Sequence, residues 1–196
     1  MSTARKPKCT VNEYLAREAA SPEKHEYFQG EVFAMAGASP AHNRIASNIH
    51  WRLGQQLDGG ECLPNLSDVL VNAASLYTYP DLSVVCPPIE REQGPIEVLL
   101  NPKILIEVLS PSTERYDRNI KFSHYRQIAS VQEILLIQQD APAIEHYARQ
   151  PDGIWALTTA EGMAATIELP CIGCQLTLSQ VYANVEFPPH PFAIVP

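Results

Sequence analysis

Apolar residues recur every four positions between residues 45 and 57, which is the spacing of one face of an α-helix. Ser39 ahead of this stripe is a favourable N-cap, and the proline that follows it suits the first helical position. Glycines at 59–60 favour an end to the helix. The pattern therefore predicts a long amphipathic helix. A shorter helix is predicted over residues 11–20, with Thr10 as its N-cap.

The other apolar segments are short and bounded by proline, glycine or polar residues, as is typical of β-strands. Residues 103–109 are apolar except for Lys103 and Glu107, which predicts a central strand covered on both faces. A hairpin turning at Gln29-Gly30 is predicted over residues 25–35. Further strands are predicted over 61–71, 79–86, 131–138, 143–149, 154–160 and 166–169, and helices over 113–128 and 178–183. This order predicts an α/β (α+β) fold, in which helices flank a mixed sheet.

The length of 196 residues and the mass of 21.7 kDa suit a single domain. We expect a disordered lead-in over residues 1–9, one domain over 10–186 and a proline-rich tail over 187–196. No apolar run approaches the roughly 20 residues of a membrane helix, so no membrane association is expected. The first residues do not resemble a secretory signal, which predicts a cytoplasmic protein whose five cysteines are free thiols.

The chain is acidic, with a formal net charge of −8 and a pI near 5.2. This charge argues against a protein that coats nucleic acid by electrostatic attraction alone, because such binding needs many lysines and arginines facing phosphates. It leaves open an enzyme that meets DNA through a local basic strip and a bound cation.

Two carboxylates stand out against apolar surroundings. Asp81 opens the predicted strand over 79–86, and Glu107 interrupts the apolar strand over 103–109. If these strands are neighbours, both side chains converge at one edge of the sheet. Two such acids favour an oxygen-liganded Mg²⁺ between them. The alternative is that each acid pairs with an arginine or caps a helix.

Several motifs resemble one known family. Pro80-Asp81, Glu107-Val108-Leu109 and the Ser110–Thr113 segment are similar to the Uma-two family of restriction-endonuclease-like proteins, within the PD-(D/E)XK nuclease superfamily. Tyr116-Asp117-Arg118 with Lys121, and the upstream segments 26–32 and 39–42, add to the resemblance, which covers roughly residues 11–185. It implies a restriction-endonuclease-like central mixed sheet, with an N-terminal hairpin, extra C-terminal strands and a metal-dependent site at the sheet edge.

The superfamily pattern places a lysine two positions after the second acid, where this chain has Leu109. Lys121, on the following predicted helix, is the best replacement for a charge that orients water and stabilises the phosphoryl group. The alternative for Lys121 is a surface ion pair with Asp117, four residues earlier. The same helix also carries Arg115, Arg118, His124 and Arg126, which form either a phosphate-binding strip or a solvated face.

Glu31 and His42 are second-tier candidates, since the superfamily resemblance allows a further acid in this region and a histidine there could accept a proton. The alternative for His42 is a partly buried helix residue. Cys171 and Cys174 form a lone C-x-x-C, which we interpret as two small buried thiols around a turn because two further zinc ligands are lacking nearby.

Together these features predict a metal-dependent DNA endonuclease that hydrolyses phosphodiester bonds. Asp81 and Glu107 would bind Mg²⁺, with Mn²⁺ as a substitute, and Lys121, Glu31 and His42 would assist. The competing hypothesis is a nuclease-like nucleic-acid-binding or interaction module with little or no turnover, which Leu109 and the net charge of −8 favour. A homodimer would suit two cuts on a duplex, with C-terminal edge strands as an interface.

Overall fold

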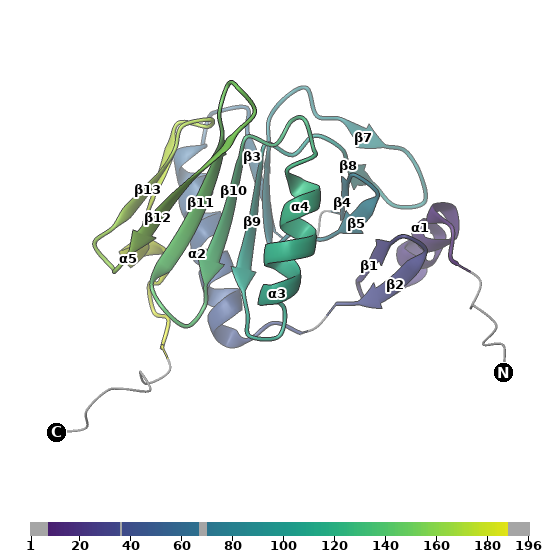
Figure 1. Ribbon diagram of the computed structural model, residues 1–196, viewed down its shortest axis with the longest axis horizontal. Helices are drawn as coiled ribbons and strands as arrows, with labels where there is room; N and C mark the ends of the chain where they lie inside the picture. Colours follow the sequence, from purple (N-terminus) through teal and green to yellow (C-terminus); the bar gives the residue numbers. More distant parts are fainter. Residues whose placement is uncertain (1–7, 36, 67–69, 188–196) are drawn as a thin grey trace.

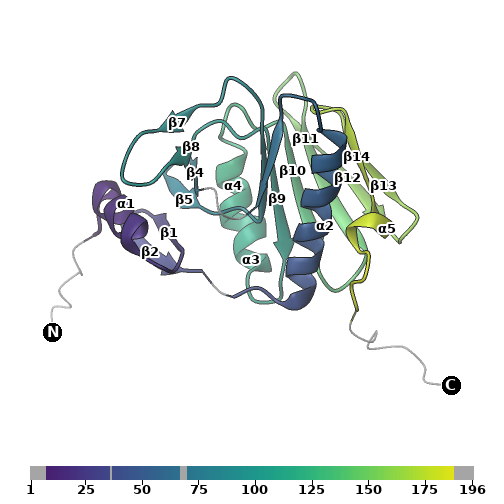
Figure 2. The same cartoon turned by 180° about the vertical axis from the view of Figure 1, so that it is seen from behind.

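The computed structural model describes residues 8–35, 37–66 and 70–187 (Figures 1 and 2). It contains two six-stranded sheets and a separate two-stranded hairpin, with helices packed against them. This is the mixed, helix-flanked architecture that the sequence predicts. Within the described residues, no helix has the length and apolar character needed to cross a membrane.

The larger sheet forms the centre of the molecule. Its parallel pair, β9 (Ile104–Leu109) and β10 (Glu133–Gln138), is extended by antiparallel neighbours on both sides. The strand order is β12-β11-β10-β9-β6-β3. The outer strands are β3 (Leu63–Leu66), β6 (Leu82–Val85), β11 (Ala143–Arg149) and β12 (Trp155–Glu161). Every residue of β9 is buried, as expected for a central strand covered on both faces.

Helices cover the two faces of this sheet (Figures 1 and 2). One face packs on α2 (Pro40–Gln56), on α5 (Leu178–Val181) and on the hairpin of β13 (Thr166–Leu169) and β14 (Cys174–Thr177). The other face packs on a continuous helical segment, α3 (Glu114–Tyr116), the π-helix η1 (Asp117–Lys121) and α4 (Phe122–Tyr125). The Ser39 side chain accepts a hydrogen bond from the His42 amide, which confirms the predicted cap of α2.

The smaller sheet has the order β2-β1-β5-β4-β8-β7. Helix α1 (Val11–Ala20) packs on it through Tyr14, whose ring lies 5.2 Å from that of Tyr27. Thr10 and Glu13 form a capping box at the start of α1. The strands are β1 (His25–Phe28), β2 (Glu31–Ala34), β4 (Leu70–Ala73), β5 (Leu76–Thr78), β7 (Arg91–Glu92) and β8 (Val98–Leu99).

Three expectations from the sequence are wrong or incomplete. The single strand predicted over 61–71 is two strands, β3 and β4, which belong to different sheets. The prediction failed because apolar character does not reveal where a chain leaves one sheet for another. The strand predicted over 79–86 begins only at Leu82, and β5, β7 and β8 are too short to leave a periodic signal. The helix predicted over 113–128 contains a π-helical turn.

The expectation of five free thiols is also wrong, because Cys62 and Cys86 form a disulfide. They flank the antiparallel pair β3–β6, in which Leu63 lies opposite Val85, so the pairing brings two residues 24 positions apart into contact. The structure describes Cys9, Cys171 and Cys174 as free thiols. The last two lie around a turn as predicted, but only Cys174 is buried, and Cys171 is half-buried.

The predicted lead-in and tail fall largely outside the described residues, at 1–7 and 188–196. The described ends are packed: the Cys9 amide donates a hydrogen bond of 3.0 Å to the Gly30 carbonyl, and the Phe187 ring lies 5.4 Å from that of Tyr182.

Candidate active site at the ends of β6 and β9

Asp81 and Glu107 meet at one end of the large sheet. Strands β6 and β9 are antiparallel with Leu82 opposite Ile106, so Asp81, just before β6, faces Glu107 across the ladder. The Val108 amide donates a hydrogen bond of 2.8 Å to Asp81 Oδ2, so the carboxylate continues the ladder where β6 has not yet begun. The structure therefore brings these two predicted residues together on neighbouring segments.

Glu107 points to the sheet face that α3, η1 and α4 cover. Its neighbours on that side, Leu105 and Leu109, pack in the same apolar cluster as Tyr125. The Tyr125 hydroxyl donates a hydrogen bond to Glu107 Oε1. Glu107 is only 2% exposed, and burial raises the pKa of its carboxyl well above the ordinary value even though Lys121 opposes this shift. Glu107 is thus a buried acid held in one orientation.

Lys121 lies inside this cluster and not on the helix surface. Its Nζ is 3.1 Å from Glu26 Oε1 and 3.2 Å from Glu107 Oε1, and the residue is 6% exposed. Nζ is also 3.6 Å from Asp117 Oδ1, so the expected pair with Asp117 exists but is buried. Burial alone would lower the pKa of Lys121, yet the surrounding acids, Glu107 foremost, raise it well above its usual range. The ammonium is therefore a permanent positive charge beside Glu107.

The helical segment after β9 explains how Lys121 reaches this position. Asp117, Lys121 and Tyr125 are spaced by four residues and are all buried, so they share the side that faces the sheet. The π-helical turn spans Asp117 to Lys121, and turns of this type are frequent at functional sites.

Glu26 is a member of the cluster that sequence reasoning missed. It lies in β1, is buried, and accepts a hydrogen bond from the Thr78 hydroxyl of β5. The available signal was an acid within a short strand of aromatic residues. The sequence pointed instead to Glu31, which the structure places in the exposed strand β2. Glu31 takes part in none of the ion pairs that the structure describes between residues 8 and 187.

His42, in the first turn of α2, contacts the same Asp81 oxygen that accepts a hydrogen bond from the Val108 amide. Its Nε2 lies 3.0 Å from Asp81 Oδ2, and its side chain is mostly buried. Burial acts to lower the pKa of His42, but the hydrogen bond and charge of Asp81 outweigh it and raise the pKa. The structure thus brings His42 to the Asp81–Glu107 pair, while Glu31 stays apart.

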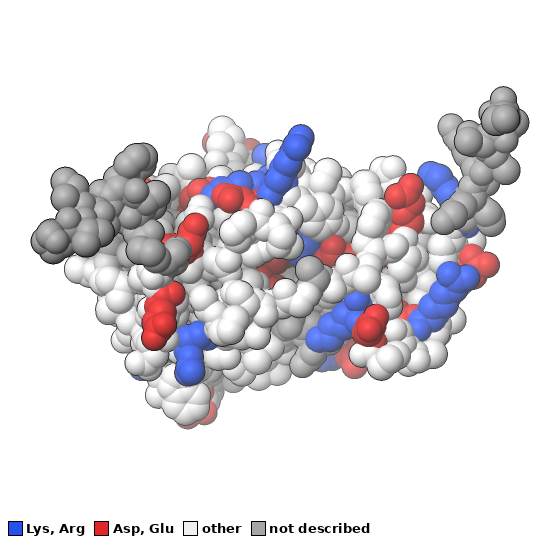
Figure 3. All heavy atoms as spheres, turned by 90° about the horizontal axis from the view of Figure 1, so that it is seen from below, with Lys and Arg blue, Asp and Glu red and all other residues white. Residues whose placement is uncertain are grey.

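The predicted basic strip is interrupted by acids. Arg118 is held 2.7 Å from both Glu114 and Glu145, and the His124 ring lies 3.0 Å from the Ala73 carbonyl. Arg115 is exposed. Figure 3 shows the end of the molecule toward which β9 runs, and the basic and acidic side chains there are interspersed among uncharged ones. The helix therefore resembles a solvated face more than a continuous cationic track.

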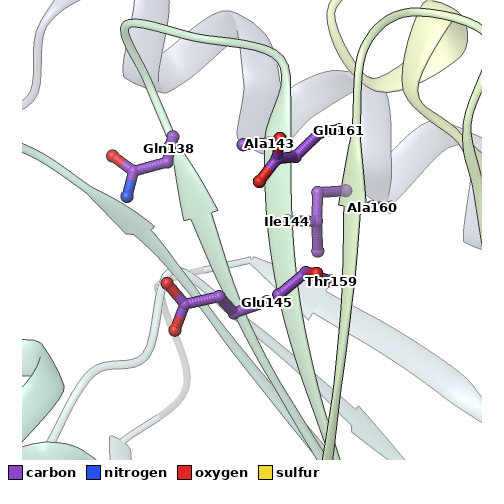
Figure 4. A pocket seen from close by; sticks show the side chains of 7 residues that line it. All are labelled: Gln138, Ala143, Ile144, Glu145, Thr159, Ala160 and Glu161. Carbon is purple, nitrogen blue, oxygen red and sulfur yellow. The ribbon is translucent and has the colours of Figure 1, made fainter.

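A hollow of about 150 Å³ lies over β10, β11 and β12 (Figure 4). Its lining includes Gln138, Glu145, Thr159 and Glu161, and it contains neither Asp81 nor Glu107. Glu145 is also the carboxylate that binds Arg118, so the hollow borders the helix that carries Lys121.

The chain matches one family model and is similar to two proteins of Synechocystis. A family model for Uma2, described as "Putative restriction endonuclease", matches residues 11–179. An uncharacterized protein of Synechocystis is 35% identical over 183 residues, which cover 92% of this chain and 95% of the relative. A second uncharacterized protein from the same organism is 37% identical over 161 residues, which cover 81% of this chain and 91% of the relative.

The fold also matches a solved structure. The crystal structure of a protein from Anabaena variabilis, described as a putative nuclease belonging to DUF820, superposes with a TM-score of 0.69. The two chains are 19% identical, and the match covers 86% of this chain and 96% of the other. At this identity the likeness shows a shared fold. Since the family model extends from α1 into α5 and both Synechocystis relatives match along most of their length, this chain belongs to the Uma2 family.

Proposed function

We propose that this protein is a Mg²⁺-dependent endonuclease that hydrolyses phosphodiester bonds in DNA. The observation that carries the proposal is the buried cluster at the sheet end, where Glu26, Glu107 and Asp117 surround Lys121 and Asp81 lies opposite Glu107 across the strand ladder. Family membership and the fold of the Anabaena protein support a nuclease in general. The metal dependence and the roles of individual residues are inferred from the chemistry of the cluster.

The cluster carries more negative charge than its own cations balance. One lysine and one histidine face four carboxylates, and burial raises the pKa of both Glu107 and Asp117. Such a surplus of buried negative charge is costly unless a cation or protons neutralise it. A cation that binds oxygen ligands fits this donor set.

The donor set suits Mg²⁺ better than a transition metal, because the acids supply hard oxygen ligands. Within the described residues, no group of three or more His, Cys, Asp or Glu side chains is spaced as a complete metal cage. Mg²⁺ does not need one, since it commonly uses one or two carboxylates, waters and substrate phosphates. Asp81 and Glu107 would hold the ion. When bound, Mg²⁺ supplies positive charge to phosphoryl oxygens and makes a water more acidic.

The side chains of this protein would perform the remaining work. Lys121 would stabilise the charge that develops on the phosphoryl group. It would replace the lysine of the superfamily pattern, whose position is occupied by Leu109 in this chain. Tyr125 and the Val108 amide fix the Glu107 and Asp81 carboxylates by hydrogen bonds, which preserves their positions between turnovers. His42, held by Asp81, would exchange a proton with the reacting water or the leaving group.

Cleavage of plasmid and single-stranded DNA tests this function, with Mg²⁺ or Mn²⁺ and with a chelator as the blank. We expect metal-dependent cleavage by the wild type and its loss in Asp81→Ala and Glu107→Gln. Glu31→Gln is the matched control, because it removes an exposed acid away from the cluster and should cleave normally.

A nuclease-like binding module is the second candidate, favoured by Leu109 and by the interrupted basic helix. No metal-dependent cleavage by the wild type, with DNA binding that Asp81→Ala leaves unchanged, would support that module and reject the endonuclease.

A further inference from the structure

The outermost strand of the large sheet, β12, has a free edge. Among the described residues it pairs with β11 alone. Ile167 of the β13–β14 hairpin and Ala160 of β12 belong to one apolar cluster on a face of the sheet, and no strand pairing joins the hairpin to β12.

The direction of each backbone group in β12 follows from the bonds at its two ends. The Gln150 amide donates to the Ile154 carbonyl at 2.7 Å, and the Gly162 amide donates to the Pro142 carbonyl at 2.9 Å. Hydrogen-bonded and non-bonded pairs alternate in antiparallel ladders, so the even-numbered residues of β12 bond to β11. The odd-numbered residues, from Trp155 to Glu161, therefore turn their N–H and C=O groups toward the free edge.

This edge lacks the features that normally prevent strands from associating. Residues 153–160 contain no charge and no proline, and Ile154 and Leu157 are 64% and 52% exposed. Edge strands usually carry lysine or proline, or are very short. A seven-residue strand with neither protection is a template for another strand.

The other edge strands of the two six-stranded sheets are shorter than β12. In β3, a strand of four residues, Pro64 removes a donor and its carbonyl oxygen lies 3.2 Å from His50 Nε2. In the smaller sheet, β7 has two residues, both charged, and β2 has four residues and begins with Glu31. β12 is therefore the longest edge strand of the two six-stranded sheets.

We propose that β12 is the interface of a homodimer, in which two copies pair antiparallel about a twofold axis and join their large sheets. A second copy fits because the edge is complementary to itself in charge. The Arg149 guanidinium stacks 4.7 Å from the Trp155 ring at one end, and the exposed carboxylate of Glu161 lies at the other. Antiparallel pairing places the partner's Glu161 at the Arg149 end, and the uncharged middle lets two acidic chains approach.

Full overlap of the two strands determines the register. The centre of β12 is Thr158, so Leu157 lies opposite the partner's Thr159, and both have outward backbone groups. Thr158 then lies opposite its own copy in a non-hydrogen-bonded pair, where Cα atoms are about 4.5 Å apart. That separation is near the range that a disulfide spans.

Light scattering during size-exclusion chromatography tests the dimer. We expect the wild type to have twice the mass of 21.7 kDa. Leu157→Pro removes an outward N–H and leaves the ladder with β11 complete, so it should yield a monomer that melts near the wild-type temperature. Leu157→Lys tests the same edge without altering the backbone, and should weaken dimerisation at least tenfold. Leu63→Lys, a similarly exposed leucine on β3, is the control and should remain dimeric.

Oxidative cross-linking tests the register. Thr158→Cys should form a disulfide-linked dimer on a non-reducing gel, whereas the wild type, with its three free cysteines, should not. Thr159→Cys should cross-link weakly, because its position faces Leu157 of the other copy. A monomeric wild type would overturn the proposal. So would a dimer that neither Leu157 variant disrupts and that Thr158→Cys does not cross-link. An edge occupied only by a different protein would overturn it as well.

Discussion

Lys121→Met is the substitution whose consequences the structure defines best. It keeps most of the side-chain length and removes the charge that lies 3.1–3.6 Å from three carboxylate oxygens. With an effective dielectric constant of about 20, each of these contacts is worth about 5 kcal/mol before desolvation. Burying the ammonium offsets much of that gain. Measured losses when one partner of a buried ion pair is removed are about 3–5 kcal/mol, and we expect this range for the free energy of unfolding.

Lys121→Met should therefore lower stability more than the replacement of a surface lysine would. A lysine on a helix surface could be replaced with little effect on stability. Lys121, however, is buried, and the acids around it would remain buried without a counter-charge. For a chain of this length the melting temperature should fall by about 6–20 °C. Arg115→Met, on the same helical segment but exposed, should stay within about 0.5 kcal/mol of the wild type.

The pH dependence of Lys121→Met provides an independent check. Without the ammonium, the pKa of Glu107, already raised by burial, should rise further. The folded state then binds more protons than the unfolded state above the unfolded pKa, so stability falls as pH rises. Urea unfolding in the presence of a chelator should show a larger loss at pH 8 than at pH 5.5. A variant as stable as the wild type at pH 8 would refute the assignment of Lys121 as the counter-charge.

Three further predictions concern other contacts. Asp81→Ala leaves the Val108 amide and His42 without their acceptor, so it should lower the unfolding free energy by about 1–3 kcal/mol in urea titrations, whereas Glu31→Ala should have little effect. Burial acts to raise the pKa of Glu133, but hydrogen bonds from His146 and the Cys171 amide lower it overall. The contribution of Glu133 to stability is therefore present above its unfolded pKa and is lost as pH falls through its folded pKa. Between pH 6 and pH 3, the melting temperature should fall more steeply for the wild type than for Glu133→Gln. Reducing the Cys62–Cys86 disulfide frees a loop of 24 residues and should lower the free energy of unfolding by about 3 kcal/mol. Dithiothreitol should therefore lower the melting temperature of the wild type but not that of Cys62→Ser. An unchanged melting temperature of the wild type would argue against a structural role for this bond.

Elements with local signals could be predicted from the amino-acid pattern. The apolar stripe and the Ser39 cap of α2, the Thr10 cap of α1, and the apolar run of β9 each depend on residues within a few positions of one another. Propensity, capping and burial act over that range, so the pattern of residues carries the information. The sequence predicted the convergence of Asp81 and Glu107 on the condition that their strands are neighbours. The pairing of β6 with β9, in which Leu82 lies opposite Ile106, meets that condition and sets the register that brings the two acids together.

Contacts between distant segments could not be predicted in this way, because they depend on how the whole chain folds. The tertiary structure divided residues 61–71 between two sheets, paired Cys62 with Cys86, and brought Glu26 of β1 to Lys121 while leaving Glu31 exposed. Each of these depends on strand order and register, and a shift of one residue in a strand turns every side chain to the opposite face. The burial of Lys121 has the same origin: its charge is stabilised by acids from other elements, which no spacing along the helix records.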